Sequence, residues 1–425
     1  MRVPTVDVVG RADDERQRGT RCAEFEAWLS IMDASLPLHQ LLLGFSVVIG
    51  SACWLSVFVC ALGFRARTLH GLAALPLSPG VTVLKPVCGL EKNLAVNLRS
   101  ACLQDYSPYQ VVYSVQREDD PALPLLREIQ REFGPERVVV ACSSESVGAN
   151  GKINNLAGAL PHARHELLVI SDSDVLLRPD YLRRIVAPLA DPDVGIVSTL
   201  FRARDAGPWY EQMEQLTLNA DHFALAMLSS AAGLADFCFG ASTALSKTTL
   251  AAIGGFEGLG DFLTEDTEMG RRVLGLGKRL VDVPYVVDTT IDLASPGHWW
   301  RKQTYWDQNT RVAKPRVFIA SLLLRVIPLA LLFGALRGWD SWGLWLMGIA
   351  FAARMAAAVA VVAVALADVR GLLSIWLIPI KDVLSLIWFV RAFTTRRVVW
   401  RGTEMALTSD GRLSAIESPA RAGAQ

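Results

Sequence analysis

The stretch LLVISDSDVL, residues 167–176, places two carboxylates, Asp172 and Asp174, at the end of an apolar run. The run predicts a buried strand over 165–177, and on extended backbone a two-residue spacing puts both side chains on the same side. Carboxylates this close repel each other, and burial strengthens the repulsion. A divalent cation such as Mg²⁺ or Mn²⁺ would remove the conflict, whereas a solvated turn or a helix cap would explain the acids without a metal.

The residues around this strand alternate between short apolar runs and helix-like stretches. We expect strands at 80–87, 109–116, 136–142 and 165–177, and helices at 93–105, 122–134 and 151–163. This alternation predicts an α/β domain with a largely parallel sheet. Ligands of open α/β sheets bind beyond the carboxyl ends of the strands, which is where Asp172 and Asp174 fall.

The composition indicates a membrane protein, because 52% of the 425 residues are hydrophobic and the mean hydropathy is +0.31. A chain of this length exceeds the usual size of one core, so two structural parts are expected. Lys plus Arg and Asp plus Glu both number 42, so the net charge does not indicate a nucleic-acid partner. Seven cysteines without a CxxC pair indicate reduced thiols in a cytosol-like compartment.

Residues 36–64 contain no Asp, Glu, Lys or Arg and are long enough to span a bilayer. The charged segment 1–35 lacks the short basic start of a signal peptide, so we expect 36–64 to remain as an anchor. Arg65 and Arg67 follow directly, which predicts a cytoplasmic location for the domain at 80–312.

Three further apolar stretches, 317–336, 342–367 and 371–390, predict a membrane region at 317–393 with two or three helices. The stretches contain charged residues: Arg325, Arg354 and the Lys381-Asp382 pair. Ionisable residues at bilayer depth usually face protein or water. The arginine-rich tail, 394–425, is expected in the cytoplasm, but three full spans would place it outside. Either one segment is re-entrant or interfacial, or the charge rule fails here.

Other acids also follow expected strands: Glu91 after the first, and Asp119 and Asp120 after the second. Glu265 and Asp266 begin a helix-like stretch, 262–273, where Thr264 is a possible cap and a carboxylate could simply favour the helix dipole. The glycines just before it predict a mobile loop: Gly254, Gly255, Gly258 and Gly260.

Two stretches near the membrane region each allow two interpretations. The helical pattern of 209–230 fits a core helix, or a helix on the membrane surface that admits lipid. The aromatic stretch HWWRKQTYWDQNTR, 298–311, fits an interfacial aromatic belt, a functional role, or both.

Taken together, the motifs VTVLKPVCGLEKNL, SVQREDDPA, VGANGKINNL, ISDSDV, FGAS and LTEDTEMG, followed by the Trp-rich stretch, resemble the ceramide glucosyltransferase family. This is family 21, which is similar to the family 2 glycosyltransferases, and it has bacterial members that include hopanoid-linked glycosyltransferases. The motifs occur in the family's order across about residues 80–312, with an anchor before them and an apolar block after them. The resemblance implies a GT-A domain, with a Rossmann-like mixed sheet and helices on both faces, joined to transmembrane helices.

The resemblance also implies roles for individual residues. Asp172 and Asp174 correspond to the acids that bind Mg²⁺ or Mn²⁺, and Asp266 corresponds to the catalytic base. The residues expected near the nucleotide sugar are Pro86, Glu91, Asp120, Lys152, Asn154 and Asp172. Those expected near the acceptor or the product phosphates are His222, Gly240, Glu265, Trp306 and Arg311.

The sequence departs from the family in its last motif, which is Gln or Arg, two residues, then Arg-Trp. Here KQTYW places Lys302 and Tyr305 at the first and fourth positions and keeps Trp306. The role of the missing arginine near the product phosphates is therefore in doubt, and Arg301 or Arg311 could replace it.

The implied reaction is an inverting transfer of a sugar, with glucose favoured, from a UDP-sugar to a lipid hydroxyl, with ceramide favoured. A hopanoid or diacylglycerol acceptor remains open, as does a non-catalytic membrane scaffold with a degenerate transferase fold. A polymer channel would need more C-terminal spans. Abundant Ala, Arg and Leu favour a GC-rich bacterial genome and hence a bacterial inner membrane. The sequence does not indicate an oligomeric state.

Overall fold

The computed structural model describes residues 37–70, 78–233, 235–394, 397–400, 403–408 and 411–415. The predicted N-terminal segment 1–35, with Cys22, lies outside the described residues. The six cysteines within them are free thiols.

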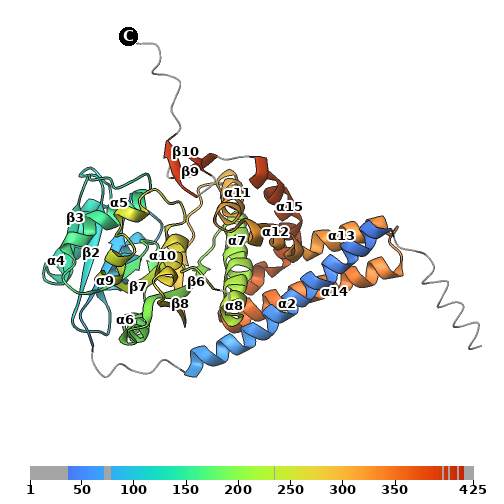
Figure 1. The fold of residues 1–425 in the computed structure, drawn as a ribbon, viewed down its shortest axis with the longest axis horizontal. Helices are drawn as coiled ribbons and strands as arrows, with labels where there is room; N and C mark the ends of the chain where they lie inside the picture. The colour runs from blue at the N-terminus through green and yellow to red at the C-terminus, as the bar shows by residue number, and fades with distance from the viewer. Residues whose placement is uncertain are drawn as a thin grey trace, which may run out of the picture.

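An eight-stranded sheet forms the centre of the part that precedes the C-terminal apolar helices (Figure 1). Its strands are β1 (Val81–Pro86), β2 (Tyr109–Val115), β3 (Val138–Cys142), β4 (Leu167–Ser171), β5 (Val175–Leu176), β6 (Val194–Arg204), β7 (Ser242–Ser246) and β8 (Arg279–Thr290). Their order in the sheet is β3-β2-β1-β4-β7-β6-β8-β5. β1 pairs in parallel with β2 and β4, β2 with β3, and β6 with β8, whereas β7 runs antiparallel to β4 and β6, and β5 to β8. The sheet is therefore mixed, as in a GT-A fold, rather than largely parallel.

Helices cover both faces of the sheet because successive strand residues point to opposite sides. Val83 of β1 packs with α3 (Leu94–Cys102), α4 (Leu123–Phe133) and α6 (Tyr181–Val186). Its neighbour Leu84 packs in the other core with α5 (Gly151–Ala159), α9 (Lys247–Ala252) and α10 (Glu265–Gly275). Both cores are continuous along the sheet, so the strand ends that carry the acids are held rigidly.

The predicted strand 165–177 is wrong in one respect that matters for the site. β4 ends at Ser171, the chain turns through Asp172, Ser173 and Asp174, and β5 begins at Val175 on the far edge of the sheet, where it pairs with β8. The two acids therefore lie on a turn, and their proximity comes from that turn rather than from strand alternation.

Three helices are long and apolar enough to cross a membrane: Leu38–Thr68, Ser341–Ala365 and Gly371–Thr394. The stretch expected at 317–336 is instead a bent pair, Pro315–Leu324 and Val326–Leu336, with an angle of 58° between its halves, so it is a broken span or a re-entrant loop. The break falls at Arg325, which is one of the charged residues noted in the sequence.

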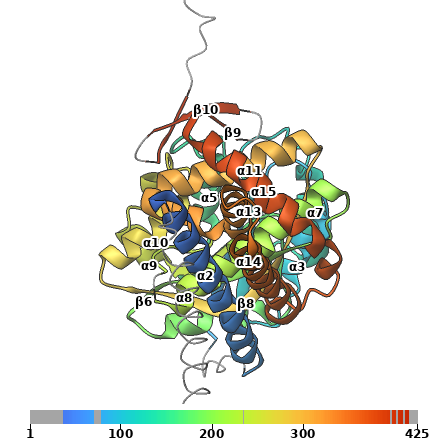
Figure 2. The same ribbon diagram turned by 90° about the vertical axis from the view of Figure 1, so that its right-hand side faces the viewer.

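The helices of the membrane region are α2 (Leu38–His70), α12 (Pro315–Ala320), α13 (Val326–Leu336), α14 (Ser341–Val359) and α15 (Ile378–Thr394). α2, α13 and α14 lie side by side (Figures 1 and 2). α15 packs on α11 (Pro296–Ala313), the Trp-rich helix, which brings the membrane region directly against the part that contains the eight-stranded sheet.

The 209–230 stretch is a core element at this junction. It folds as α7 (Trp209–Leu216), a π-helical turn (Thr217–His222) and α8 (Phe223–Ala231). Phe223 and Met227 are buried against α2 residues, which favours the core interpretation over a membrane-surface helix. Trp299 is likewise only 2% exposed, so it does not belong to a lipid-facing belt.

The tail contributes structure that the sequence analysis did not anticipate. β9 (Arg397–Trp400), β10 (Thr403–Leu407) and β11 (Leu413–Ala415) form an antiparallel sheet in the order β11-β10-β9. Leu413 donates its backbone N–H to Asp261 O (2.8 Å), and Leu263 donates to Gly411 O (3.1 Å). The tail therefore braces the loop that precedes Glu265 and Asp266.

Candidate active site

The turn between β4 and β5 carries two partly buried carboxylates, Asp172 and Asp174, beside the buried Lys85. Burial, with Asp172 and Glu91 adding to it, raises the pKa of Asp174 to about 7. The Nζ atom of Lys85, on β1, donates to the backbone oxygens of Asp172 (2.6 Å) and Val175 (3.0 Å). Burial lowers the pKa of Lys85 to about 8, against the opposing effect of Asp174 and Asp172. The carboxylates of Asp172, Asp174 and Glu91 thus carry more negative charge than the single ammonium of Lys85 balances.

This donor set fits a hard divalent cation that is shared with a ligand. Carboxylate oxygens are what Mg²⁺ and Mn²⁺ prefer, and a raised carboxylate pKa marks a place where positive charge is favourable. Within the described ranges, no group of three or more His, Cys, Asp or Glu side chains converges to hold a metal. Asp172 and Asp174 would therefore hold such a cation only together with oxygens from water or from a phosphate group.

Asp266, the second residue of α10, is the other acid of interest. Its Oδ2 accepts the Gly240 N–H (3.0 Å), and its Oδ1 accepts the Thr267 N–H (2.7 Å). Burial and the neighbouring Glu265 raise the pKa of Asp266 to about 6, although Lys152 and the two N–H groups oppose the shift. Thr264 occupies the cap position of α10 but its side chain makes no capping hydrogen bond. A carboxylate with this pKa suits proton abstraction near neutral pH.

Lys152 joins the two acidic motifs into one site. Its Nζ is 2.8 Å from Asp172 Oδ1, 2.9 Å from Glu265 Oε1 and 3.0 Å from the oxygen of Gly240. Burial lowers the pKa of Lys152, but Asp172 and Glu265 outweigh it and hold the pKa well above its usual value. Lys152 is therefore a charged ammonium that ties the β4–β5 turn to the start of α10.

Asn150 orients Lys152, and sequence reasoning missed this residue. Its side-chain oxygen caps α5 by accepting from the N–H groups of Lys152 (2.9 Å) and Ile153 (3.3 Å). Its amide nitrogen donates to Phe262 O (2.8 Å) and to Glu265 Oε2 (3.3 Å). An Asn directly before a helix-like run is a recognisable capping signal, and here it also fixes the loop ahead of Asp266.

Four other residues expected near the nucleotide sugar lie around this cluster. Pro86 is the last residue of β1, and Glu91 accepts from Ser173 Oγ (2.7 Å), between the two turn acids. Asp120 accepts from Gly89 N (3.1 Å) and so braces the loop after β1. Asn154 accepts from the N–H groups of Val147 and Gly148 and shapes a loop. Glu91 thus lies at the turn, whereas the side chains of Asp120 and Asn154 hold neighbouring loops through hydrogen bonds to the backbone.

A second cluster lies where α11 meets α7 and the π-helical turn. The rings of His222 and Trp306 meet edge to face at 5.0 Å. Trp306 Nε1 donates to Glu214 Oε1 (3.1 Å), Lys302 Nζ lies 3.2 Å from the same oxygen, and Gln303 donates to the other oxygen. The Glu214 side chain is fully buried. Glu214 could not be recognised from the sequence, because a single Glu in a helical pattern normally indicates an exposed position.

The position of the missing family arginine is filled by Tyr305, which is partly buried. Burial raises the pKa of Tyr305 far above its usual value, and the charges of Glu265, Asp266 and Lys152 also act on it. Tyr305 is therefore a neutral phenol within electrostatic reach of Asp266. The guanidinium of Arg311 lies 5.8 Å from the ring centre of Phe393, so Arg311 lies beside α15.

A mixed GT-A sheet with two acidic motifs at its ligand edge, bridged by a lysine, defines a glycosyltransferase. The family description "Glycosyl transferase family 21" matches residues 46–413, and the chain belongs to this family.

Curated relatives agree with this family. Ceramide glucosyltransferase 1 of Caenorhabditis elegans is 29% identical over 201 residues, which is 47% of this chain and 43% of the relative. The ceramide glucosyltransferase of Komagataella phaffii is 30% identical over 122 residues, 27% of this chain and 24% of the relative. The matched region thus spans less than half the length of either relative.

Among solved structures, a mannosyltransferase from Pyrobaculum calidifontis in complex with GDP-Man and Mn²⁺ is similar, with a TM-score of 0.49 and 21% identity. The similarity covers 83% of this chain and 98% of that one.

Proposed function

We propose that this protein is a membrane-bound inverting glycosyltransferase that moves a sugar from a UDP-sugar to a lipid hydroxyl. Glucose and ceramide are the favoured donor sugar and acceptor, because the relatives described above are ceramide glucosyltransferases. The observation that carries the proposal is the Lys152 bridge, which holds the Asp172 turn and the Glu265-Asp266 motif in one site.

On the donor side, Asp172 and Asp174 would hold a divalent cation, which would offset the negative charge that grows on the departing diphosphate. Lys85 and Lys152 keep fixed positive charge beside these acids before any ligand arrives. Glu91 accepts a hydrogen bond from Ser173 and thereby orients the turn that carries Asp172 and Asp174.

On the acceptor side, Asp266 takes the proton of the lipid hydroxyl as its oxygen attacks the anomeric carbon. Gly240 and Thr267 fix both oxygens of Asp266, so the carboxylate is aimed before the acceptor arrives. A single displacement inverts the anomeric centre, so an α-linked donor gives a β-glycoside without a covalent enzyme intermediate. The acceptor enters from the bilayer, where α11, α7 and α8 pack on the membrane helices.

We further propose the following organisation: an anchor at 36–64, a cytoplasmic catalytic domain at 80–312, a membrane region at 317–393 and a tail at 394–425, in a bacterial inner membrane. Arg65 and Arg67 at the end of α2 support the cytoplasmic side. Cysteines introduced at exposed positions of α4 should react with a membrane-impermeant thiol reagent only after cells are opened; labelling of intact spheroplasts would contradict this orientation.

The proposed function is tested with the full chain in lipid nanodiscs. UDP release is measured with UDP-glucose and other UDP-sugars, with ceramide, diacylglycerol or a hopanoid in the disc or without them. We expect release that needs both the donor and ceramide, and NMR of the product should show a β-linkage. Release with another lipid alone would replace the acceptor, an α-linkage would contradict inversion, and no release under any condition would favour the scaffold alternative.

A further inference from the structure

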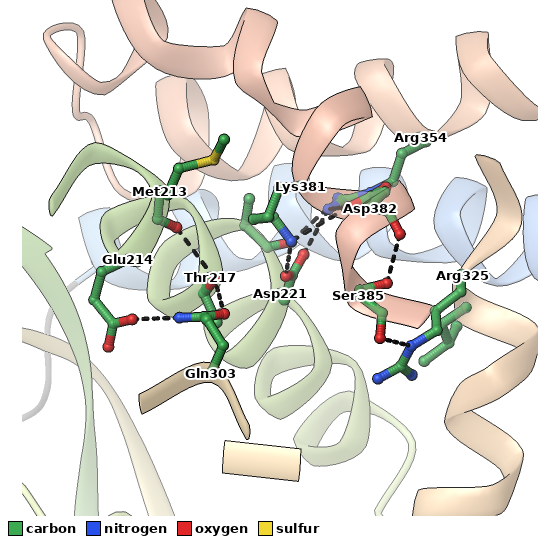
Figure 3. A network of polar contacts seen from close by, with 12 residues as sticks. Met213, Glu214, Thr217, Asp221, Gln303, Arg325, Arg354, Lys381, Asp382 and Ser385 are labelled. Atoms are coloured by element: carbon green, nitrogen blue, oxygen red, sulfur yellow. Dashed lines mark hydrogen bonds and ion pairs between the residues drawn. The ribbon is translucent and has the colours of Figure 1, made fainter. Parts of the chain in front are cut away.

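Charged residues of the membrane helices form a buried network of ion pairs with Asp221 of the π-helical turn between α7 and α8 (Figure 3). Arg354 of α14 pairs with Asp382 of α15 (Nε to Oδ2, 2.8 Å) and with Asp221 of the π-helical turn (2.5 Å). Lys381 of α15 also pairs with Asp221, and it lies 3.3 Å from Asp382. The side chains of Arg354, Lys381 and Asp382 are at most 6% exposed. Two acids and two bases pair with one another, so their formal charges balance within the protein.

A second link of the same kind reaches α11. Arg325 lies at the break of the bent helix pair. One of its guanidinium nitrogens donates to both carboxylate oxygens of Asp307, at 2.8 and 3.1 Å. Arg325 Nε donates to the oxygen of Ser385 (3.2 Å), one turn beyond Asp382 on α15. Both links therefore end on α15, and Figure 3 shows Ser385 connecting Arg325 to Asp382.

Asp221 and Asp307, the acids of the two links, are each adjacent in sequence to an aromatic residue of the second cluster. Asp221 precedes His222, and Asp307 follows Trp306, and the two rings contact each other at 5.0 Å. The π-helical turn adds a residue to the helix at this point, and such turns often occur at functional sites. Adjacent helical residues point in different directions, so one member of each pair faces the membrane helices and the other faces its partner ring.

Stability alone does not account for the network. Moving four charges out of water carries a large cost, and apolar replacements of buried ion pairs are often neutral or stabilising. What a set of paired charges provides instead is a fixed position for the elements that carry them.

We propose that Asp221 and Asp307 are positioning residues that fix the His222–Trp306 pair from the membrane side. The membrane helices then do more than anchor the enzyme, because they set the geometry of the rings at the acceptor entrance. This inference rests on the proposed function, since it concerns the acceptor half of that reaction.

The experiment compares single and paired replacements in the full chain in nanodiscs. Asp221→Asn leaves Lys381 unbalanced, whereas Asp221→Asn with Lys381→Met removes both charges and keeps the Arg354–Asp382 pair intact. Asp307→Asn with Arg325→Met does the same at the second link. Arg337→Met with Asp340→Asn removes a matched ion pair at the α13–α14 turn, which does not contact the site. Each variant is measured for melting temperature, UDP affinity, and the KM and kcat for ceramide.

We expect both site-linked double variants to match the wild type in melting temperature and UDP affinity. Their lipid-dependent kcat/KM should nevertheless fall about 10- to 100-fold, the effect expected when reacting groups are misplaced by an ångström or less. The Arg337/Asp340 variant should retain wild-type turnover. Turnover that returns to wild type together with the melting temperature would overturn the inference, because the network would then be structural only. A wild type without any turnover would instead refute the proposed function.

Discussion

Glu265 and Asp266 are adjacent acids whose surroundings give them different tasks. Glu265 pairs with Lys152 and accepts from the amide of Asn150, so its carboxylate is already neutralised by a partner. Asp266 receives only backbone N–H groups and lies against Cys238, whose thiol donates to the Asp266 backbone oxygen (2.8 Å). With a pKa raised to about 6, Asp266 can exchange a proton near neutral pH.

Replacing Asp266 by Asn keeps its shape but removes the proton acceptor. We expect turnover to fall by ~10²–10⁴-fold, about 3–5 kcal/mol of barrier, with UDP affinity little changed because Asp172 and Asp174 are untouched. If Asp266 only favoured the helix dipole, the change would cost ~0.3–1 kcal/mol of stability and turnover would survive. Calorimetric UDP titration and lipid-dependent rates of the purified variant decide this. Turnover within threefold of wild type would refute the assignment and transfer the role to Glu265.

The pH dependence of the rate follows from the same group. Because the pKa of Asp266 is raised to about 6, the folded protein keeps a proton on this base up to that pH. We expect kcat/KM to drop about tenfold per pH unit below about 6 and to level off above it, since only the deprotonated form accepts a proton. A pH–rate profile of wild type and Asp266→Asn checks this, because the variant's residual rate should lack that limb. An identical limb in both would assign it to another group.

Removing the cation or its ligand should affect the donor rather than the fold. Asp174→Asn, or EDTA on the wild type, is expected to weaken UDP binding and turnover at least tenfold, because the diphosphate loses its counter-charge. Asp119→Asn is the control, since Asp119 is an exposed acid paired only with exposed Arg117. Full activity of the wild type after exhaustive treatment with EDTA would contradict a metal-dependent reaction.

At the scale of elements, the sequence predicted most strands and helices of residues 80–163 to within a few residues, because their apolar periods are regular and tertiary contacts reinforce them. Hydrophobic periodicity did not predict the turns, because their conformation depends on local backbone geometry rather than on which face is buried. The Asp172–Asp174 turn and the π-helical turn carry no distinct hydrophobic period. In the glycine-rich stretch, Gly254 and Gly255 have positive φ in a turn, and Gly258 lies in a short 3-10 helix. There Arg272 donates to Ile253 O (2.8 Å) and Gly258 O (2.9 Å), a long-range contact that no pattern shows.

The site itself was predictable as a set of acids but not as a geometry. Asp172 and Asp174 could be selected because they follow an apolar run. Glu265 and Asp266 stood out because they begin a helix-like stretch, and the family resemblance then selected Asp266. The partners that orient them, Lys85 and Asn150, come from β1 and the start of α5, and nothing in the sequence pairs those positions. Only the assembled sheet brings them together.

The tail sheet gives an element-scale prediction. Leu413 is 6% exposed and packs with Leu263, and Tyr305 lies against the same cluster. Leu413→Ala should loosen the 261–264 loop, lower turnover several-fold and leave UDP affinity unchanged, because a buried Leu→Ala costs about 2–5 kcal/mol where it is fully packed. Hydrogen exchange of residues 261–264 should rise, whereas Leu276→Ala, at a 44% exposed position, should not change it. Unchanged exchange in Leu413→Ala would show that the tail does not brace the loop.

At the scale of the whole molecule, the catalytic and membrane parts share one core. The chain length predicted two parts, and one apolar cluster joins them. It contains Trp54 of α2, Leu200 of β6, Phe223 of α8 and Val361 of the π-helical end of α14. The Trp-rich helix adds Trp299, which packs edge to face on Trp388 of α15 at 5.3 Å. The parts are therefore expected to fold and to act together.

A fragment of residues 80–312 tests this unity. Without α2 and α15, the buried faces of Phe223, Met227 and Trp299 become exposed, so we expect a lower melting temperature, aggregation without detergent and no transfer to ceramide in vesicles. UDP binding should persist only while the fragment stays folded, because its ligands all lie within 85–266. The control is the same chain split within 71–77 and coexpressed as 1–77 and 78–425, which keeps every described contact and should retain transfer. A fragment that glycosylates vesicle lipid as fast as the full chain would reduce the membrane helices to tethers, and it would contradict both the shared core and lateral entry of the acceptor.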